Sequence, residues 1–148
     1  MSADTFIDTN VLVRVYDFGQ PEKRNAAIAR LRSTEATGSP TVSTNVLGEL
    51  YSALTRPYRA TDGSRQEPLL NPDAAAAAVR QASNYRVVTT SRAALLEALR
   101  LRGDYQLHWW DAIHLACAKE HGCTRLLTED VPSAGVIEGV TYEDPFAA

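Results

Sequence analysis

The chain has 148 residues, of which 45% are hydrophobic, and a formal net charge of −3 at pH 7. This length and apolar fraction are typical of one globular domain, so we predict a single domain spanning residues 1–148. No apolar run is long enough to cross a bilayer, and the start MSADTFIDTN lacks the basic and apolar regions of a signal peptide. We therefore predict a cytoplasmic protein.

Short apolar runs alternate with longer helical patterns along the chain, which indicates an α/β fold with a parallel sheet. Taken in chain order, we predict a strand over 5–7, helices from 11 and 21, a strand over 41–43, a helix over 46–54, a helix from 72, a strand over 86–89, a helix from 91, a helix from 109 and a strand over 125–128. Thr44 and Asn45 are expected to cap the third helix, and Gly122 is expected to end the last one.

Two segments are predicted to lack regular structure. Residues 58–70 contain glycine, proline and several charges, which favours a mobile loop. A short edge strand over 135–137 is expected to precede a polar tail. The two cysteines, Cys117 and Cys123, are too few for a disulfide framework or a zinc site, so we expect them to pack in the core.

Four acidic residues fall at one edge of the predicted sheet. Asp8 ends the first strand, and Glu49 lies about one turn into the helix after the second. Asp111 is in the first turn of the helix before the last central strand, and Asp130 follows that strand. Because parallel strands end at a shared edge and right-handed crossovers start their helices there, we predict that the four carboxylates converge.

Converging carboxylates repel one another unless a cation neutralises them. Oxygen ligands suit Mg²⁺ or Mn²⁺, and such an ion polarises a phosphodiester and activates a bound water. The cluster therefore predicts metal-dependent hydrolysis of phosphodiesters. The rest of the chain carries about equal numbers of acids and bases, so the net charge does not exclude a nucleic-acid partner.

Each acid also has a purely structural interpretation. Asp8 and Asp111 occupy positions where an acidic side chain caps a helix or interacts with its dipole. Glu49 can pair with Arg56, and Asp130 can be an ordinary turn residue. The joint placement of all four at one edge of the sheet favours the metal site.

Side chains around the cluster have alternatives as well. His114 lies one helical turn from Asp111, and either reaches the site or, as we favour, packs against the sheet. Trp109 and Trp110 either stack on a base or, as we favour, pack in the core or a dimer interface, with Trp110 expected on the core side. The predicted contacts to RNA phosphates are Arg14, Arg56 and Arg59, with Arg65 as a further candidate.

The ordered segments FIDTNVLV, NVLGELYSALTR, WWDAIHLACA and LLTED resemble the PIN-domain nucleases, and among them the VapC-type toxins of bacterial toxin-antitoxin pairs. The resemblance spans nearly the whole chain. The family's four acidic positions are matched by Asp8, Glu49, Asp111 and Asp130. Thr9 and Thr128 match polar positions beside them. The chain departs from the family in residues 58–70, which are longer and more charged, and in Glu129, a fifth acid.

The resemblance implies a three-layer α/β/α sandwich with a central, mostly parallel sheet. It also implies dependence on Mg²⁺, with Mn²⁺ as a substitute, cleavage of RNA, a homodimer and an antitoxin partner. Asp8 and Asp111 would be direct metal ligands, and Asp130 would bind the metal or orient its water. Glu49 would hold or deprotonate the attacking water.

Other functions remain as alternatives. A phosphatase of the haloacid-dehalogenase kind also places an aspartate after the first strand, but it needs a second one where this chain has Asn10. A PIN-type nuclease of RNA processing would share the whole site. A non-catalytic RNA-binding scaffold would be expected to lose acids, and all four are present. We therefore predict an endoribonuclease of the toxin type.

Overall fold

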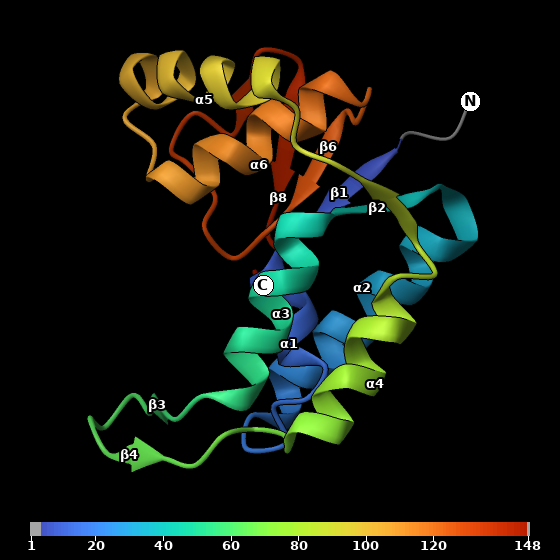
Figure 1. Cartoon of the computed structure of the whole chain (residues 1–148), viewed down its shortest axis with the longest axis vertical. Helices are drawn as coiled ribbons and strands as arrows, with labels where there is room; N and C mark the ends of the chain where they lie inside the picture. The colour runs from blue at the N-terminus through green and yellow to red at the C-terminus, as the bar shows by residue number, and fades with distance from the viewer. Residues whose placement is uncertain (1–3, 148) are drawn as a thin grey trace.

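A six-stranded sheet runs through the centre of the computed structural model, which describes residues 4–147 (Figure 1). Its strands are β1 (Thr5–Ile7), β2 (Pro40–Ser43), β5 (Arg86–Val88), β6 (Arg125–Leu127), β7 (Val136–Ile137) and β8 (Val140–Glu143). They are ordered β5-β2-β1-β6-β8-β7, and only β7 runs antiparallel to its neighbour. The predicted mostly parallel sheet is confirmed.

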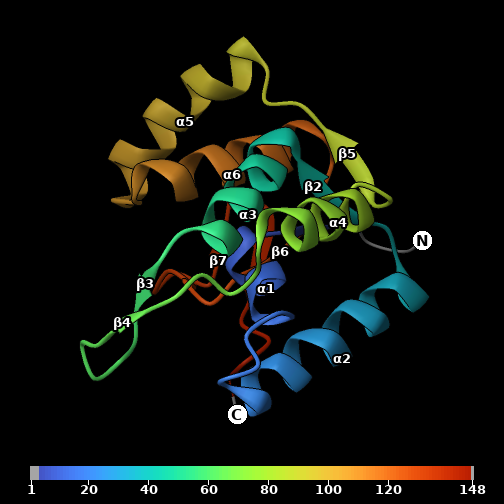
Figure 2. The same cartoon turned by 60° about the horizontal axis from the view of Figure 1, so that its bottom comes forward.

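Helices cover the sheet in two groups, which completes the predicted sandwich. The helices are α1 (Thr9–Arg14), α2 (Pro21–Thr37), α3 (Thr44–Thr55), α4 (Pro72–Ala82), α5 (Arg92–Tyr105) and α6 (Trp109–Glu120). Figures 1 and 2 show α5 packed on α6 at one side of the sheet, away from the group in which α3 packs against α1 and α4, and α2 against α1. Within residues 4–147, no helix has the length and apolar character needed to cross a membrane.

The central strands are buried on both faces because helices lie on each side of them. Phe6 and Ile7 of β1 are fully buried, as is Leu127 of β6. Removing each such side chain from water stabilises the fold by about 1.5–3 kcal/mol. Cys117 and Cys123 are also buried as free thiols, as predicted. The core therefore fixes β1 and β6 side by side, and both strands end at the same edge.

Short polar side chains cap three of the helices, α3, α4 and α5. Asn71 and Ser91 each accept a hydrogen bond from a backbone N–H in the first turn of α4 and α5. Helix α3 is capped by Ser43, whose Oγ accepts from the Val46 N–H at 3.1 Å. The prediction that Thr44 or Asn45 caps α3 is therefore wrong by one residue, because Thr44 already belongs to the helix.

The predicted polar tail contains a strand that the sequence pattern did not reveal. Residues 136–137 form the expected edge strand β7, but β8 follows it and pairs in parallel with β6. Leu126 lies opposite Tyr142 in this register. Strand β8 was missed because it is held by hydrogen bonds to β6, which is distant in sequence, and a local sequence pattern does not reveal such pairing.

The predicted loop over residues 58–70 contains a β-hairpin. Strand β3 (Tyr58–Arg59) pairs antiparallel with β4 (Arg65–Gln66). The Asp62 Oδ1 accepts from the Ser64 N–H at 2.8 Å, and Gly63 has a φ of 85°, which only glycine adopts readily. Figures 1 and 2 show the hairpin extending away from the body of the molecule. The segment is therefore not an irregular loop along its whole length.

Candidate active site

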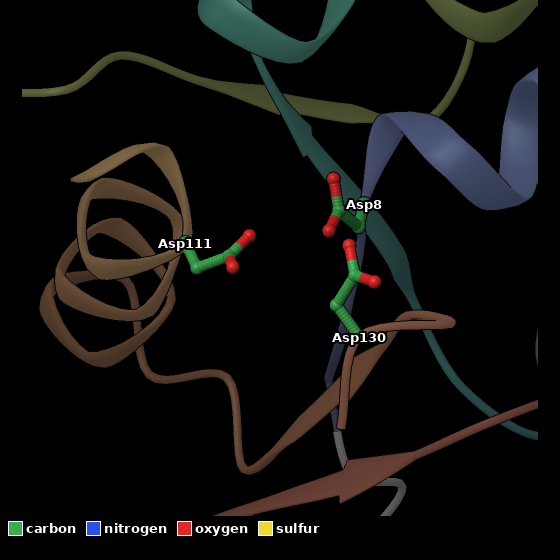
Figure 3. A group of neighbouring side chains, drawn as sticks. All are labelled: Asp8, Asp111 and Asp130. Carbon is green, nitrogen blue, oxygen red and sulfur yellow. The ribbon is translucent and has the colours of Figure 1, made fainter. Parts of the chain in front are cut away.

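Three of the four predicted acids meet at the carboxyl edge of the sheet. Asp8 follows β1 directly, and its backbone N–H donates to the Leu127 carbonyl at 3.0 Å. Asp130 follows β6, and Asp111 lies in the first turn of α6. One carboxylate oxygen from each of the three lies within 4.8 Å of the others. Figure 3 shows the three side chains pointing toward one another from their separate elements.

The structural alternative for Asp8 is not supported by its contacts. Asp8 occupies the N-cap position of α1, but its side chain makes no capping hydrogen bond. Its Oδ2 instead accepts from the Thr128 Oγ1 at 2.9 Å. The carboxylate therefore turns toward the end of β6 rather than toward the helix it precedes.

Thr128 and Asn10 hold the carboxylates in a shared hydrogen-bond network. Thr128 Oγ1 donates to Asp8 and accepts from the Asp130 N–H at 3.0 Å and from Asn10 Nδ2 at 3.1 Å. The same Asn10 amide donates to Asp130 Oδ2 at 3.3 Å, and its oxygen accepts from the Glu129 N–H at 3.3 Å. Thr128 is thus fully satisfied, with one bond donated and two accepted. The network fixes the end of β6 against the end of β1.

Burial and mutual repulsion act on the acidic cluster. Burial raises the pKa of Asp8 above its ordinary value, although His114 and Thr128 act in the opposite direction. Burial, followed by the charges of Asp8 and Asp130, raises the pKa of Asp111 to about 6. Carboxylates in this arrangement are stabilised by a cation, and three oxygen donors suit a hard divalent ion. The residues present therefore fit a metal ion.

Glu49 lies beside this cluster without joining it. Its Oε2 accepts from the Thr9 Oγ1 at 3.4 Å, and its Oε1 lies 3.3 Å from His114 Nε2. The alternative pairing with Arg56 is absent from the ion pairs of the described residues. Glu49 therefore reaches from α3 into the same cleft as the acidic cluster, and His114 lies between it and Asp8.

His114 is both buried and in contact with the site. It is 2% exposed, and its ring lies 5.7 Å from that of Phe6 between centroids. Its Nε2 lies 3.7 Å from Asp8 Oδ1 as well as close to Glu49. Burial alone lowers the pKa of His114, but the two carboxylates outweigh burial and raise it. The two predicted alternatives for His114 are therefore compatible.

Arg14 is engaged by acidic neighbours. Its Nε donates to Glu129 at 2.8 Å, and a second nitrogen donates to the same carboxylate at 3.2 Å. A third contact joins Arg14 to Asp17 at 2.9 Å. Glu129, the acid next to Asp130, therefore holds Arg14 in the described structure. Its Oε2 also lies 3.5 Å from Lys23 Nζ.

A cleft of about 1260 Å³ extends from the acidic cluster along α1 and α3 to the hairpin. Its acidic end is lined by Asp8, Glu49, Asp111 and Asp130. Its hairpin end is lined by Arg56, Tyr58 and Arg59, whereas Arg65 does not line it. Within residues 4–147, Arg56 and Arg59 form no ion pair with a carboxylate. Arg59 Nη1 donates to the Gly63 carbonyl at 2.9 Å within the hairpin. The cleft therefore joins an acidic end to an end where two guanidinium groups have no carboxylate partner among the described residues.

The sequence prediction was wrong about the position of Trp110, and it did not include Asn10 in the site. Trp110, expected on the core side of α6, is 52% exposed and lines the cleft, whereas Trp109 packs partly against the core. Helical spacing alone did not distinguish which of two adjacent tryptophans faces the sheet. Asn10 was not predicted as a site residue, although its place two residues after Asp8 on the first turn of α1 is a usable signal.

Comparison with known proteins identifies the family. The family model of the PIN domain matches residues 5–131. The chain belongs to the PIN domain family. This PIN domain includes all of the acidic residues described above, and its matched region ends just after Asp130. No curated protein matches the sequence.

Solved structures share the fold of this PIN domain at low sequence identity. A toxin-antitoxin complex from Klebsiella pneumoniae is 20% identical, with 97% of this chain and 99% of that chain covered and a TM-score of 0.68. VapBC2 from Rickettsia felis, bound to a promoter DNA fragment, is 12% identical, with 95% and 98% covered and a TM-score of 0.66. VapC20 of Mycobacterium tuberculosis, a toxin that cleaves the sarcin-ricin loop, is 21% identical, with 90% and 97% covered and a TM-score of 0.61.

Proposed function

We propose that this PIN domain is a Mg²⁺-dependent endoribonuclease, with Mn²⁺ as a substitute ion. The observation that carries the proposal is the meeting of three carboxylates from Asp8, Asp111 and Asp130 at one point of a large open cleft. Membership of the PIN family and the likeness to a toxin that cleaves RNA support the reaction class.

Asp8, Asp111 and Asp130 are the residues that would hold the ion. A bound divalent ion supplies Lewis-acid polarisation of the phosphodiester and a more acidic water. Thr128 and Asn10 hold Asp8 and Asp130 beside each other. Thr128 donates to Asp8 Oδ2 and accepts from the Asp130 backbone N–H, and the Asn10 amide donates to both carboxylates. Preorganised ligands avoid the cost of assembling the site during the reaction.

Glu49 is proposed as the group that handles the attacking water. Its carboxylate lines the cleft next to the cluster, and 36% of its side chain is exposed. The carboxylate accepts the proton that the water loses as it attacks phosphorus, and it is oriented meanwhile by Thr9 and His114. As the new P–O bond forms, the bond from phosphorus to the leaving ribose oxygen breaks, and that oxygen takes a proton from solvent. Partial exposure lets the same proton pass to solvent after the reaction.

Arg56 and Arg59 are proposed as contacts to RNA phosphates. Both line the hairpin end of the cleft, and a guanidinium fork matches phosphate oxygens. Arg56 lies seven residues beyond Glu49, which corresponds to about 10 Å along a helix axis. Arg14 is left out of this set because Glu129 and Asp17 already occupy its guanidinium.

The biological context is proposed to be a toxin-antitoxin pair in the cytoplasm. Support comes from the solved relatives, several of which are VapBC or toxin-antitoxin complexes that cover nearly the whole chain. We further propose a homodimer and a small antitoxin that blocks the cleft. A neighbouring gene for an antitoxin-like protein would support this role over that of an RNA-processing nuclease, which would share the same site.

Substitution of the proposed ligands tests the enzymatic function. We expect Asp8→Asn and Asp111→Asn to reduce RNA cleavage by more than about 100-fold, since even partners of metal ligands contribute 10–100-fold. Circular dichroism should show an unchanged fold, and Mn²⁺ binding measured by calorimetry should be lost. Asp73→Asn is the matched control, because Asp73 is also in the first turn of a helix but lies outside the cleft.

Two outcomes would contradict the proposal. Cleavage retained by both purified ligand variants would show that the acidic cluster is not the catalytic site. Tight Mn²⁺ binding by the unaltered protein with no cleavage of any RNA would favour the non-catalytic scaffold instead.

A further inference from the structure

Trp110 exposes a large apolar ring beside the acidic cluster. The residue is 52% exposed, whereas its neighbour Trp109 packs partly against the core. A tryptophan side chain offers about 150–250 Å² of surface for burial, and leaving much of it in water forgoes a large favourable contribution. The indole therefore leaves an apolar face open to the cleft, beside the acidic cluster.

The place of Trp110 restricts which ligand can lie on this face. Trp110 immediately precedes Asp111 in the first turn of α6, and both residues line the same cleft. The cleft is also lined by Asp8 and Asp130. A molecule that lies on the indole in the cleft therefore lies next to the proposed metal ligands as well.

Most other exposed apolar side chains lie outside the cleft, and Tyr58, the other exposed aromatic that lines it, lies at the hairpin end. Leu95, Leu96 and Leu99 on α5 and Tyr51 on α3 are all more than two-fifths exposed, and none of them lines the cleft. Trp110 differs from them because it combines exposure with proximity to the acids. Trp110 is therefore not part of the apolar surface that these side chains form outside the cleft.

We propose that Trp110 is a stacking platform for an unpaired nucleobase beside the scissile phosphate. The inference rests on the proposed function for the identity of its ligand and assigns a residue that positions this ligand. Every base offers a flat π-face to an indole, but a base inside a duplex has its faces covered by its neighbours. RNA that is single-stranded at the cleavage site therefore fits this cleft, and continuous duplex does not.

Tryptophan fluorescence tests this inference directly, because the chain has only two tryptophans. In the Trp109→Phe variant, Trp110 is the single reporter. We expect its emission to be quenched by an oligoadenylate of about a dozen nucleotides, a length within the span of single-strand binding sites. The same oligomer paired with oligouridylate should quench much less. The measurement uses the metal-free protein, so that no RNA is cleaved.

Binding of labelled oligoadenylate, measured by anisotropy, provides the second readout. Trp110→Ala should weaken binding by roughly 5- to 150-fold, the range reported for loss of one stacked base. Trp110→Phe should retain most of the affinity because it keeps an aromatic face. Tyr51→Ala, which removes an exposed aromatic outside the cleft, should bind like the unaltered protein.

The outcomes separate this inference from the proposed function. Unchanged Trp110 emission, equal quenching by duplex, or full affinity in Trp110→Ala would overturn the stacking platform, even if the unaltered protein cleaves RNA with Mn²⁺. Quenching by single strands in a protein that never cleaves RNA would support the platform and reject the nuclease. A response of the emission to protein partners alone would assign Trp110 to an interface and also overturn the inference.

Discussion

His114 connects the buried face of α6 to the proposed chemistry. Its ring packs near Phe6 of β1, while Nε2 lies 3.3 Å from Glu49 and 3.7 Å from Asp8. The Nδ1 atom is buried and has no partner among residues 4–147, so the tautomer with hydrogen on Nε2 avoids burying an unpaired donor. The histidine is thus suited to orient Glu49 from within the core.

Replacement of His114 should separate rate from binding. We expect His114→Phe to lower kcat for RNA cleavage by about 10- to 100-fold, as for other residues that orient a catalytic group. KM and Mn²⁺ affinity should change far less, and His114→Gln should restore part of the rate by returning an N–H donor. His121→Phe is the control, since His121 lies at the other end of α6 and outside the cleft. A parallel loss of rate, metal affinity and thermal stability would instead assign His114 a structural role only.

At the residue scale, the sequence predicted correctly those site residues that come directly after a strand. Asp8 and Asp130 could be placed together because each follows an apolar run that had to be a parallel strand. The ion pair of Arg14 with Glu129 could not be predicted, because it joins residues 115 positions apart. The orientation of Trp110 depends on the rotation of α6 against the sheet, which adjacent aromatic residues leave ambiguous.

The turn between β7 and β8 ties three elements together. Glu138 and Gly139 both have positive φ angles, 49° and 88°, as a two-residue hairpin turn requires. A left-handed conformation is unfavourable for glutamate, at a cost of about 1–2 kcal/mol. Its carboxylate offsets this with hydrogen bonds from Arg100 and Tyr105 of α5 and from Lys119 of α6. Glu138 therefore attaches the hairpin to the helical layer.

Acid should weaken this attachment. Hydrogen bonds from Arg100, Lys119 and Tyr105 lower the pKa of Glu138 from 4.5 to about 2. The stability that it contributes is therefore present above pH 4.5 and is lost as the pH falls toward 2. The effect should be small, about 1 kcal/mol or less, because solvent screens these groups. Denaturant unfolding across this range should show a smaller acid-induced loss in Glu138→Gln, and equal losses in both proteins would exclude the mechanism.

Two elements show where sequence patterns stop being informative. Strand β8 has only four residues and follows a turn with glutamate in a position where glycine or asparagine is usual. The hairpin of β3 and β4 has exposed polar strands, so apolar alternation was not available, although its Asp62-Gly63 pair is a recognised turn signal. The long helices were marked by starting and ending residues such as Pro21 and Gly38, and the strands β1, β2 and β6 by short apolar or β-branched runs, and these elements were predicted correctly.

At the scale of the whole molecule, the cleft separates its charges along its length. The acids gather where β1 and β6 end, while Arg56 and Arg59 lie at the hairpin end without carboxylate partners among the described residues. A net charge of −3 is therefore compatible with RNA binding, because the two arginines without carboxylate partners lie together at one end of the cleft.

The salt dependence of RNA binding should show whether Arg56 and Arg59 contact RNA phosphates. Each phosphate contact to a single strand contributes about −0.7 to the slope of log affinity against log salt. Arg56→Ala with Arg59→Ala should therefore flatten the slope by about 1.4 and weaken binding at low salt. The control is Arg80→Ala with Arg102→Ala, which removes equal charge outside the cleft. Equal slopes in the two double variants would assign the effect to net charge rather than to contacts.

The order of the strands also affects when the site first exists. Asp8 and Asp130 are separated by 122 positions in sequence, yet they share one hydrogen-bond network through Thr128 and Asn10. A chain still emerging from the ribosome cannot bring them together until β6 has left the exit tunnel and paired with β1. If the protein is a ribonuclease, its nascent form is harmless to the messenger that encodes it until residue 130 has emerged and β6 has paired with β1.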